Sequence, residues 1–211
     1  AKDIMTLSKK TGKGTISLAK EIEVLLSADK TVYDSIDEKH KVLNAYCNAV
    51  GHKVSGEKVS VDCTKLCNVL NEMSSWIADH IRKTEWITNK EGNSWFNGYY
   101  DNSGNAVEGD FSSGVRMMLT GQVFAIMSGT ATDEQVAKIV KSADDYLYDG
   151  AIGGYRLNTN FNEVKTDLGR MFGFAFGHKE NGAVFSHMAV MYANALYRRG
   201  FAKEGYKVIN T

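Results

Sequence analysis

The chain has 211 residues, of which 25 are basic and 25 acidic, so its formal net charge is zero. A neutral chain offers no bulk attraction to nucleic acid or to an anionic membrane surface, and we expect neither as a partner. No apolar run approaches the ~18 residues of a membrane span, and no basic segment followed by an apolar one opens the sequence.

The first half of the sequence predicts three helices. Apolar residues at helical spacing, with Ser17 as a candidate N-cap, predict a helix over 17–26. A second apolar stripe predicts a helix over 37–50, which a Gly-, Lys- and Ser-rich break at 51–58 follows. The most regular periodicity predicts a third helix over 61–87.

The three cysteines form no CxxC pair. Cys63 and Cys67 are four residues apart, as on one face of a helix, and lack the further His or Cys ligands of a metal site. We therefore expect reduced thiols and no bound metal. Thiols of this kind favour a reducing, cytoplasmic location.

The second half alternates between loops and shorter helices. Residues 89–110 and 150–177 are rich in Gly, Asn and aromatic side chains, which is typical of long loops or short hairpins at one end of a helical domain. Apolar periodicity predicts the remaining helices, which cover 121–128, 132–144 and 183–199, with one more beginning near 203–205.

Two short sequences carry specific local signals. Thr132 with Gln135 three residues later predicts a capping box at the start of a helix. The sequence of 101–104, Asp-Asn-Ser-Gly, predicts a turn. No βαβ alternation, fixed-period repeat or linker interrupts the chain. We therefore predict one mainly α-helical domain over 1–211, a helical toroid whose loops gather at one mouth.

The loops after residue 90 concentrate the residue types that bind sugars. Aromatic rings stack on the apolar faces of a sugar, while amide and charged groups bond its hydroxyls. The set comprises Trp95, Phe96, Tyr99, Tyr100, Asp101, Arg156, Asn158, Asn160, Lys179, Glu180, Asn181 and His187. Aromatic-rich loops also pack as lids, so composition alone leaves a purely structural role open.

Four blocks, in the same order along the chain, resemble segments of the cellobiose and chitobiose phosphorylases and their β-glucan phosphorylase relatives. Residues 177–187, GHKENGAVFSH, resemble the KENGGIFxH segment of that family. Residues 97–104 are similar to its RAYDxxG turn, 119–129 to its PQxWAVLSG helix, and 12–18 to its GKGESVWL segment. The resemblance implies an inverting glycoside phosphorylase, with this chain as a later part of its (α/α)6-barrel catalytic domain of six helical hairpins.

The resemblance also implies roles residue by residue. The histidine that ends the KEN block binds phosphate in the family, which implies His187 here. A histidine at a helix N-terminus suits an anion. The implied substrate-binding residues are Lys179, Glu180 and Asn181 of the KEN block, together with Tyr100, Asp101 and Gln122 of the two preceding blocks.

The general acid of the family is the second aspartate of an Asp-Trp-Asn-Asp motif, nine residues before the glycine that opens the GKG block. Counting back from Gly12 reaches Asp3, which the resemblance therefore implies as the catalytic acid. Ala1 and Lys2 stand where the family has Trp and Asn, so an ordinary exposed aspartate is the alternative at this position.

An inverting glycosidase needs a second carboxyl to activate water, whereas a phosphorylase uses inorganic phosphate as the nucleophile. We therefore expect phosphorolysis of β-glucosidic linkages in β-glucan oligosaccharides, with phosphate as co-substrate, no other cofactor, and α-glucose 1-phosphate as product. The linkage stays open, and relatives of this type are commonly homodimers. Other parts of the family's phosphate site are expected outside this sequence, so we expect the isolated chain to be inactive.

Two alternatives to a phosphorylase stay open. One is an inverting hydrolase on the same toroid, with a second carboxyl facing Asp3 about 6.5–9.5 Å away. The candidates for that carboxyl are Asp101, Glu108 and Glu180. The other alternative is a sugar-binding fragment without catalysis.

Overall fold

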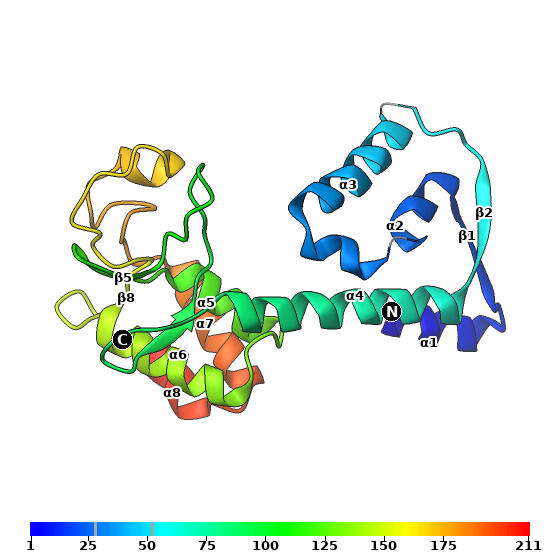
Figure 1. The fold of residues 1–211 in the computed structure, drawn as a ribbon. Coiled ribbons are helices and arrows are strands. Elements are labelled where there is room, and N and C mark those ends of the chain that lie inside the picture. Colours follow the sequence, from blue (N-terminus) through cyan, green and yellow to red (C-terminus); the bar gives the residue numbers. More distant parts are fainter. Residues whose placement is uncertain (28, 52) are drawn as a thin grey trace. The chain divides into compact units, whose positions relative to one another are not determined.

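The computed structural model describes residues 1–27, 29–51 and 53–211 (Figure 1). The chain divides into two compact units, 1–77 and 78–211. Helices make up most of the regular structure in both units, which confirms the prediction of a mainly α-helical chain. Compact units can belong to one larger domain, so a single domain over 1–211 stays a prediction. Across the described ranges, no helix has the length and apolar character needed to cross a membrane.

The first unit combines short helices with a two-stranded sheet. Its helices are α1 (Lys2–Thr11), α2 (Glu23–Ser27), α3 (Ile36–Val50) and the first part of α4 (Cys63–Thr84), with 3-10 turns at Lys20–Ile22 and Lys30–Asp34. β1 (Thr15–Ala19) pairs antiparallel with β2 (Lys58–Asp62). α3 confirms the helix predicted over 37–50, and its first turn is capped by Ser35, whose hydroxyl accepts the N–H of Glu38 at 3.4 Å.

The helix predicted over 17–26 is wrong in its first part, because those residues belong to β1. The register of the sheet sets Ile16 opposite Val61 and Leu18 opposite Val59, so apolar side chains pair across the two strands. The third predicted helix begins only at Cys63, because the preceding residues belong to β2. It ends at Thr84, so it is shorter than the predicted 61–87 at both ends. A partner strand some forty positions away thus overrides the local helical spacing.

Burial in the first unit is confined to the start of α4. The buried residues there are Cys63, Leu66 and Cys67, and no described side chain from 1 to 62 is buried. Both cysteines are free thiols on one face of the helix, as predicted. Cys67 Sγ lies 3.3 Å from the carbonyl oxygen of Ala1, which ties the beginning of the chain to α4.

The second unit places four further helices and three hairpins after the end of α4, within the described residues. The helices are α5 (Leu119–Met127), α6 (Asp133–Tyr146), α7 (Ser186–Arg198) and α8 (Ala202–Ile209), with a 3-10 turn at Gly169–Gly173. The antiparallel hairpins are β3 (Trp86–Thr88) with β4 (Ser94–Phe96), β5 (Gly109–Phe111) with β6 (Gly114–Arg116), and β7 (Tyr148–Asp149) with β8 (Gly154–Tyr155). These elements confirm the predicted alternation of helices with loops and short hairpins.

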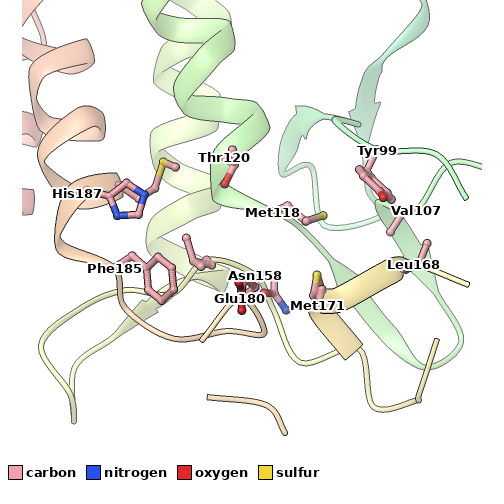
Figure 2. A pocket seen from close by; sticks show the side chains of 12 residues that line it. Tyr99, Val107, Met118, Thr120, Asn158, Leu168, Met171, Glu180, Phe185 and His187 are labelled. Atoms are coloured by element: carbon pink, nitrogen blue, oxygen red, sulfur yellow. The ribbon is translucent and has the colours of Figure 1, made fainter. Parts of the chain in front are cut away.

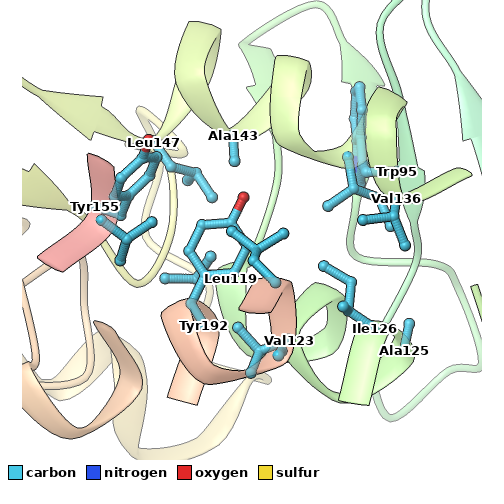
Figure 3. Close-up of a cluster of buried hydrophobic side chains, with 14 of the residues drawn as sticks. Trp95, Leu119, Val123, Ala125, Ile126, Val136, Ala143, Leu147, Tyr155 and Tyr192 are labelled. Atoms are coloured by element: carbon cyan, nitrogen blue, oxygen red, sulfur yellow. The ribbon is translucent and has the colours of Figure 1, made fainter. Parts of the chain in front are cut away.

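The core of the second unit lies where α5, α6 and α7 pack with β4 (Figure 3). Trp95 of β4, Leu119 of α5 and Tyr192 of α7 are almost completely buried in it. Phe96 is buried beside Trp95. Both residues belong to strand β4 and not to a loop, and Trp95 has no exposed surface with which to stack on a ligand. Phe96 borders a cavity of about 630 Å³, so its contact with a sugar stays a prediction.

α6 begins with the predicted capping box. The Thr132 hydroxyl accepts the N–H of Gln135 at 3.3 Å, and the Gln135 side chain accepts the N–H of Thr132 at 3.0 Å. Two N–H groups that the helix leaves unpaired are satisfied in this way. The box fixes where α6 starts and so which of its faces, with Val136 and Ile139, enters the core.

We expect Thr132→Ala to lower the free energy of unfolding by about 1 kcal/mol, because the N–H of Gln135 loses its acceptor. Chemical denaturation monitored by circular dichroism measures this loss. Lys138→Ala is the matched control, since Lys138 is an exposed residue of the same helix and alanine is the better helix former. Equal unfolding midpoints for Thr132→Ala and the wild type would show that the box contributes nothing.

Candidate active site

A cavity of about 340 Å³ lies in the second unit, beside the first turns of α5 and α7. Apolar side chains form most of its wall. Four lining residues carry polar side chains other than a tyrosine: Thr120, Asn158, Glu180 and His187. Figure 2 shows His187 and Phe185 on one side, Tyr99 and Val107 on the other, and Asn158 and Glu180 between them. The cavity thus brings together four residues of the predicted sugar-binding loops, Tyr99, Asn158, Glu180 and His187. Two of these, Glu180 and His187, also carry a role that the family resemblance implies.

His187 stands at the second position of α7, after the N-cap residue Phe185. Its side chain is exposed, and its ring packs at 5.4 Å from the ring of Phe185, measured between centroids. Phe185 has no side-chain group that caps the helix, so the first N–H groups of α7 are available to another acceptor. Helix N–H groups and an imidazole make this end of the cavity suited to an anion.

A tight turn separates the side chains of Lys179 and Glu180. The turn is closed by a bridge between His178 and Asn181, and Lys179 takes a left-handed conformation with φ of 47°. Glu180 lines the cavity, whereas the ammonium group of Lys179 lies 4.9 Å from the centre of the Phe174 ring, outside the lining. These two neighbouring residues of the KEN block therefore differ in position: Glu180 faces the cavity, and Lys179 packs against Phe174.

The Glu180 carboxylate is only partly used by the protein. One of its oxygens lies 3.3 Å from Nε of Arg170. The other oxygen is buried and has no hydrogen-bond partner among the described residues. A carboxylate oxygen with unused acceptor capacity, on a residue that lines the cavity, suits the hydroxyl of a sugar.

Asn181 is predicted to bind substrate, but its amide is used inside the protein. Its Nδ2 donates to the carbonyl of Phe174 at 2.9 Å, and its Oδ1 accepts from Nδ2 of Asn158 at 3.1 Å. Asn158 is itself fully buried, and its Oδ1 accepts the N–H of Gly182 at 2.7 Å. The pair Asn158–Asn181 thus holds the shape of the loop that carries Glu180.

Gln122 is likewise a structural residue in this conformation. Its side chain is fully buried, and its amide exchanges two 2.8 Å hydrogen bonds with the backbone of Phe96. It therefore joins α5 to β4 and has no surface to offer a ligand. We do not keep Gln122 among the residues proposed to contact substrate.

Tyr100 and Asp101 lie outside the cavity lining. Tyr100 borders a second cavity of about 630 Å³ and donates a 2.8 Å hydrogen bond to Glu85. Asp101 accepts the N–H groups of Ser103 and Asn105, both at 2.9 Å, which confirms the predicted turn. Hydrogen bonds from Asn105 hold the pKa of Asp101 below its ordinary value. Contact of either residue with substrate stays a prediction.

Asp3 belongs to the first unit, where it is an exposed residue in the first turn of α1. Gly12 ends that helix with a left-handed φ of 67°, and the carbonyl of Gly14 accepts the N–H of Cys63 at 2.8 Å. The cavity belongs to the second unit, and the two units are described separately. The role of Asp3 as general acid therefore stays a prediction.

Glu108 is a buried carboxyl next to the cavity wall. It is 2% exposed, and its two oxygens accept the N–H of Gly98 at 2.8 Å and the N–H of Met118 at 2.7 Å. Burial raises the pKa of Glu108 to about 8, against the opposite effect of both N–H donors. Of the three candidates for a second carboxyl, Glu108 is buried, Asp101 bonds its own turn, and Glu180 lines the cavity.

Sequence reasoning missed several residues of the cavity. Thr120 stands in the first turn of α5, and Phe185 precedes α7. Both positions are at helix N-termini, which is the signal that identifies them in retrospect. Arg170, the partner of Glu180, stands in a 3-10 turn that the sequence did not indicate.

Comparison with known proteins gives consistent results. A sequence profile of the glycosyl hydrolase 94 superfamily, catalytic domain, matches residues 60–211. Cellobionic acid phosphorylase from Neurospora crassa is 31% identical over 85 residues, which are 40% of this chain and 11% of that protein. Solabiose phosphorylase from Paenibacillus borealis is 26% identical over 122 residues, which are 58% of this chain and 15% of that protein.

The extent of these matches matters for the site. The profile covers all residues that line the cavity, and it leaves residues 1–59, with Asp3 and the GKG block, outside. The aligned part of the chain spans 11% and 15% of the length of these two curated relatives. Family membership is thus established most directly for the part of the chain that holds the cavity.

We expect Asn158→Ala to lower the free energy of unfolding by about 1–3 kcal/mol, because it leaves buried groups of Asn181 and Gly182 without partners. Amide hydrogen exchange should be faster at Gly182. Asn160→Ala is the matched control, since Asn160 is exposed and bonds only within its own segment in this structure. A loss no larger than that of the control would contradict the role of Asn158.

Glu108 should make stability depend on pH. Its pKa is about 8 in the folded protein against an ordinary 4.5, so the folded state holds an extra proton between these values. The resulting stabilisation is complete below about pH 4 and is lost as the pH rises through about 8. We expect Glu108→Gln to reduce the fall in urea midpoint between about pH 6 and pH 9. Parallel curves for the variant and the wild type would contradict this assignment.

Proposed function

Because this chain belongs to the catalytic domain of the glycosyl hydrolase 94 superfamily, we propose that the protein containing it cleaves β-glucosidic linkages in β-glucan oligosaccharides by phosphorolysis. The reaction inverts the anomeric centre and releases α-glucose 1-phosphate. The observation that carries this proposal is the cavity that His187 and Glu180 share. The two relatives described above are both named as phosphorylases, which favours phosphate over water as the nucleophile.

The His187 end of the cavity is proposed to hold inorganic phosphate. A phosphate oxygen forms the new bond to the anomeric carbon while the bond from that carbon to the glycosidic oxygen breaks. The leaving oxygen takes its proton from the general acid, for which Asp3 is the candidate by sequence spacing. The first N–H groups of α7 and the imidazole of His187 keep the dianion in position for attack.

The Glu180 side is proposed to bind the sugar. Its unpaired oxygen accepts a hydroxyl, and the apolar walls with Met118 and Phe185 lie against the sugar faces. Lys179 neighbours this subsite without lining it, and Tyr100 and Asp101 are proposed at its outer edge. No metal or organic cofactor is required by this scheme, in which phosphate is the co-substrate.

The chain is further proposed to supply part of an (α/α)6 barrel. α7 packs against both α5 and α8, as expected of neighbouring helices in such a toroid. The long segments between α4 and α5 and between α6 and α7 carry most of the cavity residues, and Thr120, His187 and Met188 lie in the helices themselves. A homodimer and a cytoplasmic location stay predictions.

A hydrolase on the same fold is the second candidate function, and one observation favours it. Glu180 lines the cavity and has an oxygen without a protein partner, as a carboxylate that activates water requires. The two reactions differ in their nucleophile. Sugar release that does not require phosphate would favour the hydrolase, and binding without release would favour a sugar-binding protein. Isothermal titration with β-glucooligosaccharides, with and without phosphate, adds the binding constants needed for this comparison.

We expect His187→Ala in the complete protein to raise the KM for phosphate by about tenfold or more, since one ligand of the anion is removed. His178→Ala is the matched control, because His178 lies in the loop that precedes α7 and does not line the cavity. Initial rates at varied phosphate measure both variants. An unchanged phosphate KM in His187→Ala would overturn the proposed phosphate site.

A further inference from the structure

The carboxylate of Glu108 joins two backbone segments that are far apart in sequence. Oε1 accepts the N–H of Gly98 and Oε2 the N–H of Met118, while Nε2 of Gln122 stands 3.5 Å from Oε2. The N–H of Glu108 itself donates to Oδ1 of Asn97 at 3.2 Å. Three N–H groups thus donate to the Glu108 carboxylate. Because the site is buried, water cannot take the place of the carboxylate as their acceptor if Glu108 is removed.

Two glycines make room for this carboxylate. A Cβ atom at Gly98 would lie 3.1 Å from Cα of Gly121 and 3.2 Å from Oε1 of Glu108. A Cβ atom at Gly121 would lie 3.2 Å from Cα of Gly98. The backbone at Gly98 therefore approaches α5 at Gly121 as closely as two glycines allow. The carboxylate of Glu108 lies beside this contact and accepts the N–H of Gly98.

Met118, held by Glu108, belongs to a short backbone pairing that forms the cavity wall. Met118 forms an antiparallel bridge with Asn158. On either side of it, the N–H of Leu119 donates to Leu157 at 2.8 Å and the N–H of Thr159 donates to Met117 at 3.0 Å. The position of Met118 therefore sets the position of Asn158.

The same pairing continues to the loop of Glu180. Asn158 bonds Oδ1 of Asn181 and the N–H of Gly182. The N–H of Leu157 donates to the carbonyl of Ala183 at 3.0 Å. These hydrogen bonds connect Glu108, through Met118 and Asn158, to Asn181 and Gly182, the two residues that follow the cavity-lining Glu180.

We propose that Glu108 is a positioning residue of the sugar subsite, which acts by fixing the backbone that places Glu180 in the cavity. The proposal rests on the proposed function for the identity of the ligand. Glu108 touches no ligand itself, because it is buried behind Val107 and Met118, whose side chains line the cavity. Its substitution should therefore weaken sugar binding through a displaced Glu180, in addition to any loss of stability.

The test compares Glu108→Gln with the wild type in the complete protein, with cellobiose or another β-linked glucose disaccharide that the wild type cleaves. The comparison is made at about pH 9, above the pKa of about 8 of Glu108, so that the wild type is a carboxylate with an acceptor for each N–H. Glutamine offers only one acceptor, so Gly98 or Met118 loses its partner. We expect the disaccharide KM to rise about tenfold, with kcat changed less than about threefold. Faster amide exchange at Met118 or Gly98 should accompany this change.

Ser142→Ala is the matched control for stability. Ser142 is fully buried and, like Glu108, holds backbone groups with its side chain: it exchanges two 2.9 Å hydrogen bonds with the backbone of Ser94, and it does not line the cavity. We expect this variant to unfold more easily and to keep the wild-type KM. A similar rise in KM for Ser142→Ala would show that reduced stability alone explains the effect of Glu108→Gln.

A double-mutant cycle tests whether Glu108 acts through Glu180. If it does, Glu108→Gln should raise KM much less in a Glu180→Gln background than in the wild type. Independent, multiplying effects on KM, or an unchanged KM in Glu108→Gln, would overturn the proposal. Cleavage that does not depend on phosphate would overturn the proposed phosphorylase activity but not the proposed role of Glu108, because the disaccharide KM can still be compared between variants. If no cleavage occurs, disaccharide dissociation constants from titration calorimetry provide the same cycle.

Discussion

The side chain of Asn158 has no exposed surface, so its amide must find its hydrogen bonds inside the protein. It does so with the carbonyl of Thr159, the side chain of Asn181 and the N–H of Gly182. These three bonds can exist together only when the loop of Glu180 keeps one position against the segment around Asn158. The geometry of the cavity depends on that requirement, because the same segment pairs with Met118 on its other side.

Polar residues around the cavity therefore fall into two groups with different physical roles. Glu108, Gln122 and Asn181 are buried and bonded to backbone groups, and they set the positions of the wall. His187 is exposed at a helix N-terminus, and Glu180 keeps an oxygen without a protein partner. The second group is suited to contact a phosphate and a sugar. A wall that is fixed by buried bonds reduces the reorganisation needed when these ligands bind.

Short sequence signals predicted correctly those structural features that depend on residues close together in the sequence. The box of Thr132 and Gln135 and the turn at Asp101 depend on residues within a few positions, and both are present. β1 was missed because its pairing with β2 joins residues more than forty positions apart, as Ile16 with Val61. No window of local periodicity contains both strands.

The candidate site was predictable in part for the same reason. The motif that ends at His187 indicated the correct segment, and three of its residues, Glu180, Phe185 and His187, line the cavity. Motif membership did not distinguish Glu180, which faces the cavity, from Asn181, which bonds Asn158 behind it. That difference follows from the turn at Lys179 and from a partner that is more than twenty residues away in sequence.

The central claim is that this cavity serves transfer of a glucosyl group to phosphate. The most direct test is proton and phosphorus NMR of the products that the complete protein forms from a β-glucan oligosaccharide, with and without inorganic phosphate. The account predicts α-glucose 1-phosphate as the first sugar product, and no cleavage when phosphate is omitted. Free glucose released at the same rate without phosphate would contradict it.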